Sequence, residues 1–404
     1  MMDRNDPSPL AGEGGPRRGS DEGSHRRLAQ SATDRSDVER SARPLLRQAS
    51  AATFSRKGRR NILGLTLSLL LAACATTPEV GWQAQHAAAE AMREAVRFAE
   101  EPLPAAWTDV AVQTTPVPIN DPDLEAGNGQ LVFAGGVQIT AGFNRLHGLS
   151  DIKFEDAERF FAVTDEGLLV RGRVELDAVG RLVGVGGVQV RPLVDPDGAP
   201  LIPKYLADAE GLALMPSGEL LVSFERLHRI WRYDRDGRWL GERVIPDFPF
   251  TENEGMEGIG GGITDGEGDF IAAGENGGLW QCRNNACGAM IEPPATPPTD
   301  ADLRVTSVAD VTGGGLWALQ RAYHSDRNTN TISIGTLAYG HCPLNACGGR
   351  FWSTRATFTA PATVDNFEGI AAVRRSDGGV RLYILSDDNF NPNQRTLLLA
   401  FDVR

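Results

Sequence analysis

One short phrase recurs three times in this chain: a glutamate, then a glycine, then an aliphatic residue. The three copies are Glu210-Gly211-Leu212, Glu257-Gly258-Ile259 and Glu368-Gly369-Ile370. Each is followed, 15 to 19 residues later, by a second acidic residue at the end of an apolar run; these are Glu225, Glu275 and Asp387. Repetition at such a period is typical of sheets arranged around an axis, and acids at equivalent points of the repeat would lie near that axis.

Two weaker units extend the pattern, one with His147-Gly148-Leu149-Ser150 and Asp165, the other with Thr306-Ser307-Val308-Ala309. The glycines or their equivalents fall near positions 148, 211, 258, 307 and 369, in steps of 63, 47, 49 and 62 residues. A four-stranded propeller blade needs roughly 40 to 50 residues. With an incomplete unit at 107–140, the pattern predicts an all-β propeller of six blades, with seven as the alternative. The terminal strand 396–401 would close the last blade by pairing with an N-terminal strand.

The N-terminal part predicts an exported, anchored protein. Residues 1–58 are polar without apolar periodicity, so they are either disordered or lie before the true translation start. A basic cluster and an apolar run follow, and Leu71-Ala72-Ala73-Cys74 resembles the lipobox of bacterial lipoproteins. The resemblance implies a signal peptide over 59–73, lipidation of Cys74 and, with alanine at position 75, an outer-membrane location. An uncleaved anchor or a buried cysteine is the alternative. Residues 74–106 would form a tether with a possible helix, and 107–404 the propeller.

The charge balance excludes one class of partner. The chain carries a formal net charge of −13, and its most basic part is the N-terminal segment, so the predicted propeller is strongly acidic. Binding to a nucleic acid requires clustered lysine and arginine, so we expect no nucleic-acid partner. An acidic body is compatible with bound cations. We expect a monomer.

Four cysteines besides Cys74 occur in two pairs of the same spacing, Cys282 with Cys287 and Cys342 with Cys347. Four thiolates could form a zinc site. An exported protein lies in an oxidising compartment, however, which favours two local disulfides. Each would close a short loop and contribute about 2 kcal/mol on the chain-entropy model.

The repeated acids predict a metal site. Two carboxylates about 5 Å apart repel by roughly 3 kcal/mol at an effective dielectric near 20, so a cation, arginine partners or raised pKa values must relieve them. Oxygen ligands without histidine favour Ca²⁺. The alternative is that the acids accept hydrogen bonds from backbone N–H groups of neighbouring blades. The candidate ligands are Asp165, Glu210, Glu225, Glu257, Glu275, Glu368, Asp387 and Asp388.

Few residues suggest a nucleophile or an acid–base group. No G-x-S-x-G elbow is present. Among scattered histidines, His147 is the one candidate catalytic residue. Arg226, Arg321 and Arg395 flank the acidic positions, where they could bind an anionic substrate or pair with the acids.

Residues 107 to 403 resemble the phytase-like family described as "esterase-like activity of phytase". The resemblance rests on the repeated acid–glycine phrases, on Asn253-Glu254-Gly255-Met256-Glu257-Gly258 and on Leu385-Ser386-Asp387-Asp388-Asn389-Phe390 followed by Gln394-Arg395-Thr396. It implies an exported propeller that hydrolyses phosphate or other esters with a divalent cation. The Arg-His-Gly signature of histidine phosphatases and the loop of cysteine phosphatases are absent, so metal-assisted attack by water is the expected route.

These observations lead to one hypothesis and one rival. The hypothesis is a lipid-anchored, calcium-dependent hydrolase of a small anionic ester, a phosphomonoester or a relative, acting at the mouth of the propeller channel. The rival is a non-catalytic binding or scaffold propeller of the cell envelope.

Overall fold

The computed structural model describes residues 103–404 except 262–267, 284, 311–315 and 338–351. These residues form 22 strands and two short helices, α3 (Pro122–Ala126) and α4 (Lys204–Ala207), which confirms the all-β prediction. Among them, no helix is both long and apolar enough to cross a membrane. Cys74 and the predicted segments 1–58 and 59–73, with most of 74–106, lie outside the described residues.

The strands group into five blades of four antiparallel strands, numbered here in chain order and each given from its innermost strand outwards. Blade one is β4 (Leu149–Phe154), β5 (Arg159–Thr164), β6 (Leu168–Leu176) and β7 (Leu182–Pro192). Blade two is β8 (Ala209–Leu214), β9 (Leu220–Phe224), β10 (Arg229–Tyr233) and β11 (Trp239–Arg243). Blade three is β12 (Met256–Gly261), β13 (Phe270–Gly274), β14 (Leu279–Arg283) and β15 (Ala286–Ile291). Blade four is β16 (Arg304–Asp310), β17 (Leu316–His324), β18 (Thr329–Leu337) and β19 (Trp352–Thr359). Blade five is β20 (Asn366–Arg374), β21 (Val380–Asp387), β22 (Leu397–Val403) and β3 (Leu131–Ala141).

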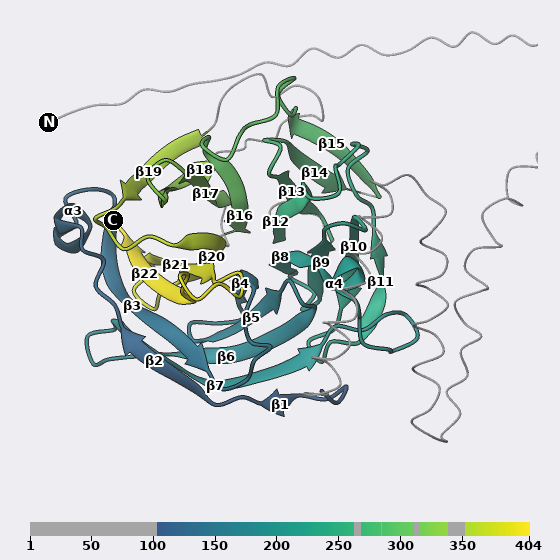
Figure 1. Cartoon of the computed structure of the whole chain (residues 1–404), viewed down its shortest axis with the longest axis horizontal. Coiled ribbons are helices and arrows are strands. Elements are labelled where there is room, and N and C mark those ends of the chain that lie inside the picture. The colour runs from purple at the N-terminus through teal and green to yellow at the C-terminus, as the bar shows by residue number, and fades with distance from the viewer. Residues whose placement is uncertain (1–102, 262–267, 284, 311–315, 338–351) are drawn as a thin grey trace, which may run out of the picture. The chain divides into compact units, whose positions relative to one another are not determined.

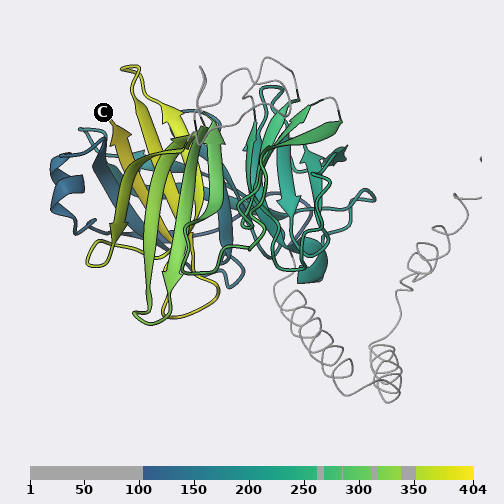
Figure 2. The ribbon, with the colours of Figure 1, turned by 90° about the horizontal axis from the view of Figure 1, so that it is seen from above.

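The five blades close into a ring. Each innermost strand contacts the innermost strands of both neighbouring blades, in the order β4, β8, β12, β16, β20 and back to β4 (Figure 1). In the side view, the strands run roughly along the axis of this ring (Figure 2). The described residues therefore form a five-bladed propeller, and the prediction of six blades is wrong.

The sixth blade was expected from residues 107–140, which instead extend two existing blades. β1 (Thr108–Asp109) pairs with β7, and β2 (Val112–Pro116) pairs with β3. β3 itself is the outermost strand of blade five, where it pairs with β22 in a register that sets Val403 opposite Leu131. The predicted pairing of the C-terminal strand with an N-terminal strand is thus confirmed, but it completes the fifth blade and starts no further one.

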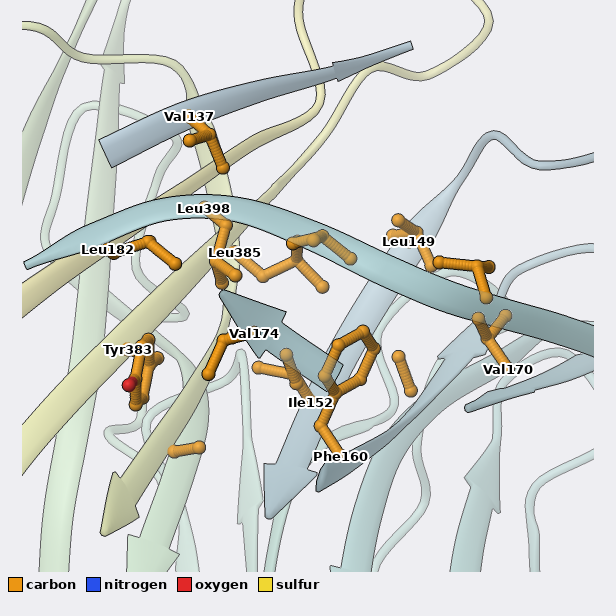
Figure 3. Close-up of a cluster of buried hydrophobic side chains, with 14 of the residues drawn as sticks. Val137, Leu149, Ile152, Phe160, Val170, Val174, Leu182, Tyr383, Leu385 and Leu398 are labelled. Carbon is orange, nitrogen blue, oxygen red and sulfur yellow. The ribbon is translucent and has the colours of Figure 1, made fainter. Parts of the chain in front are cut away.

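The core lies between the blades, in five apolar clusters, one for each pair of neighbours. Strand β21 shows how the sequence produces this arrangement. Tyr383 and Leu385 pack against Ile152 and Phe160 of blade one (Figure 3), whereas Leu382 and Ile384 pack toward blade four. Alternate side chains of a strand point to opposite faces, so a strand between two blades is apolar at nearly every position.

A buried ion pair fills the axis of the ring. Lys153 Nζ lies 2.6 Å and 2.7 Å from the two carboxylate oxygens of Asp151, and both residues belong to β4. The pair also reaches the other blades. Lys153 donates to the Ile370 carbonyl, and Asp151 accepts from the Leu212 N–H and the Ser307 hydroxyl. A pair that contacts β8, β16 and β20 at once lies on the axis, so the channel is closed at this level.

One of the two predicted disulfides is confirmed. Cys282 is bonded to Cys287, which joins β14 to β15 near the outer edge of blade three. Cys342 and Cys347 lie outside the described residues.

Candidate functional site

Every innermost strand carries an irregularity at the same point. The register against the second strand shifts there, so that an extra residue is inserted in the inner strand. Such a bulge turns a side chain out of the regular alternation of the sheet. The inserted positions, which we call the inner ring, are Ser150, Glu210, Glu257, Thr306 and Glu368.

A second set of residues lies on the second strand of each blade or directly after it, at the same end of the channel. Each comes directly after the residue that pairs with the start of the bulge, as Asp165 follows Thr164, the partner of Leu149. These positions, which we call the outer ring, are Asp165, Glu225, Glu275, Arg321 and Asp387. The two rings bring together seven of the eight predicted metal ligands, and blade four supplies an arginine where the others supply an acid.

The glycine of the repeated phrase has a packing role. A Cβ on Gly211 would lie 2.7 Å from the Glu257 carbonyl, one on Gly258 2.9 Å from the Val308 nitrogen, and one on Gly369 3.1 Å from the Cα of Asp151. Each glycine therefore admits the backbone of the next blade. The phrase combines an acid aimed at the channel with the contact that holds neighbouring blades together.

Blade two contributes the tightest cluster of carboxylates. One oxygen each of Asp208, Glu210 and Glu225 lie within 4.8 Å of one another. Asp208, which ends α4, is also held by two cations: Lys204 Nζ lies 3.1 Å from Oδ1, and Arg226 Nε lies 2.5 Å from Oδ2. Arg226, a predicted substrate ligand, is thus paired with an acid.

Lys204 links this cluster to blade one. Its Nζ lies 2.5 Å from Asp165 Oδ2, while Oδ1 of the same carboxylate is buried without a hydrogen-bond partner among the described residues. Neither Lys204 nor Asp208 belonged to the predicted site. The sequence could have indicated Asp208, because it stands two residues before Glu210 of the repeated phrase. No sequence pattern indicates Lys204.

The electrostatics of the rings show an excess of negative charge. Burial and neighbouring carboxylates raise the pKa values of Glu210 and Glu257 well above their ordinary value. Burial, reinforced by Asp208 and Glu275, raises the pKa of Glu225 to about 8. Burial also raises the pKa of Glu368 to about 7, although Arg321 opposes the shift. The Glu368 side chain is 17% exposed.

The same causes act on the remaining outer-ring acids. Burial raises the pKa of Asp165 to about 6 against the opposing effect of Lys204. Burial also raises the pKa of Asp387 well above its ordinary value, and the Glu368 carboxylate adds to the shift. Burial raises the pKa of Glu275 too, although Arg304 and Arg321 oppose the shift. Arginine pairing and raised pKa values, two of the three expected remedies for the repulsion, are therefore both present.

The eighth predicted ligand has a different environment. Asp388 Oδ2 lies 2.7 Å from His147 Nδ1 and accepts a hydrogen bond from the Thr396 hydroxyl. These hydrogen bonds lower the pKa of Asp388 despite its burial. Asp388 thus orients His147, the candidate catalytic residue, at the edge of the rings.

The three arginines predicted to bind substrate lie in different places. Arg321 remains at the rings, with Nη2 3.5 Å from Glu368 Oε1, whereas Arg395 is paired with Asp365 in the loop before β20, at 2.9 Å. Arg304, which the sequence did not single out, lies 3.1 Å from Glu275. It stands two residues before Thr306, as Asp208 stands before Glu210, so the repeat could have indicated it.

A polar pocket of about 310 Å³ adjoins the rings between blades four and five. Guanidinium, amide, phenol and carboxylate groups line it, with almost no apolar side chain. The lining residues are Asp300, Arg304, Arg321, Tyr323, Asn330, Asn366, Glu368, Asn389 and Gln394.

Comparisons with solved structures give remote likenesses. Virginiamycin B lyase from Staphylococcus aureus aligns with 10% sequence identity and a TM-score of 0.34, covering 73% of this chain and 100% of that one. The PQQ-bound aldose sugar dehydrogenase from Streptomyces coelicolor aligns with 12% identity and a TM-score of 0.30, covering 75% and 100%. No curated protein matches the chain. Residues 144–390, more than half of the chain, match the family "Phytase-like: Esterase-like activity of phytase", and the protein belongs to this family.

Proposed function

We propose that the protein hydrolyses an ester of a small anionic molecule, a phosphomonoester in the first instance, at the end of the channel where the two rings lie. We further propose that acids of the rings bind a divalent cation, Ca²⁺. The observation that carries the proposal is the clustering of seven buried or half-buried carboxylates in the two rings, with raised pKa values throughout. Family membership supports a hydrolase.

The residues fit a calcium ion. Calcium–oxygen distances are about 2.4 Å, so two oxygens on one ion are at most about 5 Å apart. The oxygens of Asp208, Glu210 and Glu225 satisfy this limit. Oδ1 of Asp165, which is buried and has no hydrogen-bond partner within the described part of the chain, is a further candidate ligand. Neither ring contains histidine or cysteine, which favours a hard cation over zinc.

A cation bound there would polarise the ester and neutralise the charge that develops on its oxygens. The chain's own groups would do the rest. Arg304 and Arg321 line the adjoining pocket, where charge-assisted hydrogen bonds can hold an anionic group. Glu368 lies beside Arg321 in the same pocket, and a pKa of about 7 suits a group that accepts a proton from water near neutral pH.

The location of the protein is also a proposal. We propose that it is exported and lipid-anchored in the outer membrane through Cys74. The disulfide between Cys282 and Cys287 supports export, because such bonds persist in oxidising compartments.

The test measures calcium binding and turnover on the same protein. We expect EDTA to abolish hydrolysis of p-nitrophenyl phosphate and Ca²⁺ to restore it. Glu257→Gln should weaken calcium binding about tenfold or more in calorimetry, since it removes one buried charge from the ring. Asp326→Asn, an equal change at an exposed acid of blade four, should alter neither property.

Two outcomes would contradict the proposal. Hydrolysis that persists in EDTA would refute the dependence on a cation. A folded protein that binds calcium but is inert on a broad panel of esters would refute the hydrolase and favour the non-catalytic binding propeller.

A further inference from the structure

A second pocket, of about 380 Å³, lies between blades one and two and is rich in arginine. Arg159, Arg171 and Arg173 come from β5 and β6, and Arg235 comes from the turn after β10; Glu155 and Asp236 are the acids of the lining. We call it the arginine pocket. Its basic lining contrasts with the net charge of −13 of the whole chain.

The arginine pocket lies away from the two rings. Strand β5 begins at Arg159, in the pocket, and ends at Thr164, directly before Asp165 of the outer ring. A strand advances about 3.3 Å per residue, so the two ends are roughly 17 Å apart. The pocket therefore opens toward the opposite end of the propeller and is separate from the proposed active site.

Acids neutralise only some of the pocket's arginines. Glu155 is shared by Arg159, at 3.2 Å, and Arg235, and Arg159 also pairs with Asp156, at 2.7 Å. Arg171 and Arg173 have no carboxylate within ion-pair distance among the described residues. Arg173 also lies directly opposite Arg159 on the neighbouring strand, where two like charges destabilise a sheet. An anion between them would remove this repulsion.

Arg171 is held in place before any ligand arrives. Its guanidinium lies over the Trp107 ring, 4.1 Å from the centroid. Its Nε donates to the Gln189 side-chain oxygen at 2.8 Å, and Gln189 in turn donates to Asp109 at 2.7 Å. Within the described residues, its two terminal nitrogens donate to nothing. A guanidinium held on one face and at Nε, with both terminal nitrogens available as donors, is preorganised to bind an anion in bidentate fashion.

The floor of the pocket leaves room for such an anion. A Cβ added to Gly187 would meet only the Arg173 side chain, at 3.8 Å. A methyl group at Gly187 would thus only touch Arg173, and the room for an anion is the pocket volume of about 380 Å³.

We propose that the arginine pocket binds a phosphate group. A tetrahedral phosphate can accept from several guanidinium groups at once, here Arg171 and Arg173 from one strand with Arg159 opposite. The group could belong to free phosphate or to the phosphodiester of an anionic lipid headgroup, because both present the same oxygens.

The test is calorimetry on the full chain in EDTA, which keeps divalent cations out of the rings. One arm titrates inorganic phosphate, and the other titrates glycerophosphoglycerol, the deacylated headgroup of phosphatidylglycerol. Arg171→Gln and Arg173→Gln should each weaken binding about tenfold or more. Arg327→Gln, an exposed arginine of blade four, is the matched control and should bind like the parent protein.

The arm with the tighter binding identifies the source of the phosphate. Absence of binding in both arms would overturn the proposal. So would an affinity of the Arg171→Gln and Arg173→Gln variants equal to that of the parent protein. Arg173 is exposed, so its variant should fold even if Trp107 packing suffers in the other one. Turnover of p-nitrophenyl phosphate should be unchanged in both, so failure of this proposal is distinct from failure of the proposed hydrolase.

Discussion

Without divalent cations, the propeller should become less stable as the pH rises from 5 to 8. The folded protein raises the pKa values of the ring acids, Glu368 to about 7 and Glu225 to about 8, whereas in the unfolded chain they titrate near 4.5. The folded state thus holds more protons than the unfolded state in this window. The free energy of unfolding must then fall with rising pH, between the unfolded and the folded pKa values.

The size of the effect follows from Glu368 alone. Its pKa rises from 4.5 to about 7, and each unit is worth about 1.4 kcal/mol, so ionising it in place costs about 3 kcal/mol. Unfolding entropy for a domain of about 300 residues is roughly 0.6 kcal/mol per degree, which converts this to about 5 °C in Tm. The other ring acids add to the fall, although coupled groups do not sum.

The assay is scanning calorimetry at pH 5, 6, 7 and 8, in EDTA and in millimolar CaCl₂. In EDTA we expect Tm to fall by about 5 °C or more across the series. Calcium should remove most of the fall, because it stabilises the ionised acids of the folded state. Glu368→Gln should make the fall in the EDTA series smaller, since glutamine does not titrate while the other ring acids still do. A Tm in EDTA that is constant or rises from pH 5 to 8 would refute the reasoning.

Three further predictions concern stability. Lys153→Met leaves the Asp151 carboxylate buried without its cation and should lower the free energy of unfolding in urea by about 3–5 kcal/mol. Adding Asp151→Asn should recover much of this loss. A loss below about 1 kcal/mol would show that the ion pair is not essential. Gly258→Ala forces a Cβ to within 2.9 Å of the Val308 nitrogen and should cost about 1–3 kcal/mol, whereas Gly129→Ala, with nothing within 4 Å, should stay within about 0.5 kcal/mol in the same assay. Replacing both cysteines of the β14–β15 disulfide by serine should lower the free energy of unfolding by about 2 kcal/mol, and an unchanged unfolding midpoint would contradict the chain-entropy estimate.

Three of the five inner-ring positions, Glu210, Glu257 and Glu368, could be singled out from the sequence because their signal is local. In three blades, an acid that must face the channel stands beside a glycine that must admit the next blade, so both requirements appear side by side in the chain. Blade one lacks this phrase. The sequence aligned it on Gly148, but the structural equivalent of Gly211 is Asp151, three residues later.

Gly148 is required for another reason. It has a φ of +63°, and a Cβ there would lie 1.8 Å from Asp165 Oδ1. The misalignment hid the buried pair of Asp151 and Lys153, whose partners lie on blades that only the closed ring brings together.

The error in blade count and the unforeseen acidic partners of two arginines have a common cause. Nothing in residues 131–141 shows that β3 lies beyond β22, because that neighbour is set by closure of the ring. Arg226 and Arg395 flank acidic positions in the sequence, yet their partners are Asp208 and Asp365 in loops whose course depends on the assembled blades. Local patterns thus fixed which residues face the channel, whereas contacts between distant segments decided what those residues touch.

The strand that completes blade five has a consequence for biosynthesis. Because β3 must wait for β22, the last of the described strands in chain order, the ring cannot close until all five blades have been synthesised. Until then, β3 and β21 each present an unpaired edge to solvent, and such edges recruit other strands. A nascent or partly translocated chain is accordingly most aggregation-prone just before β22 emerges, and deletion of β22 should lower the yield far more than its seven residues suggest.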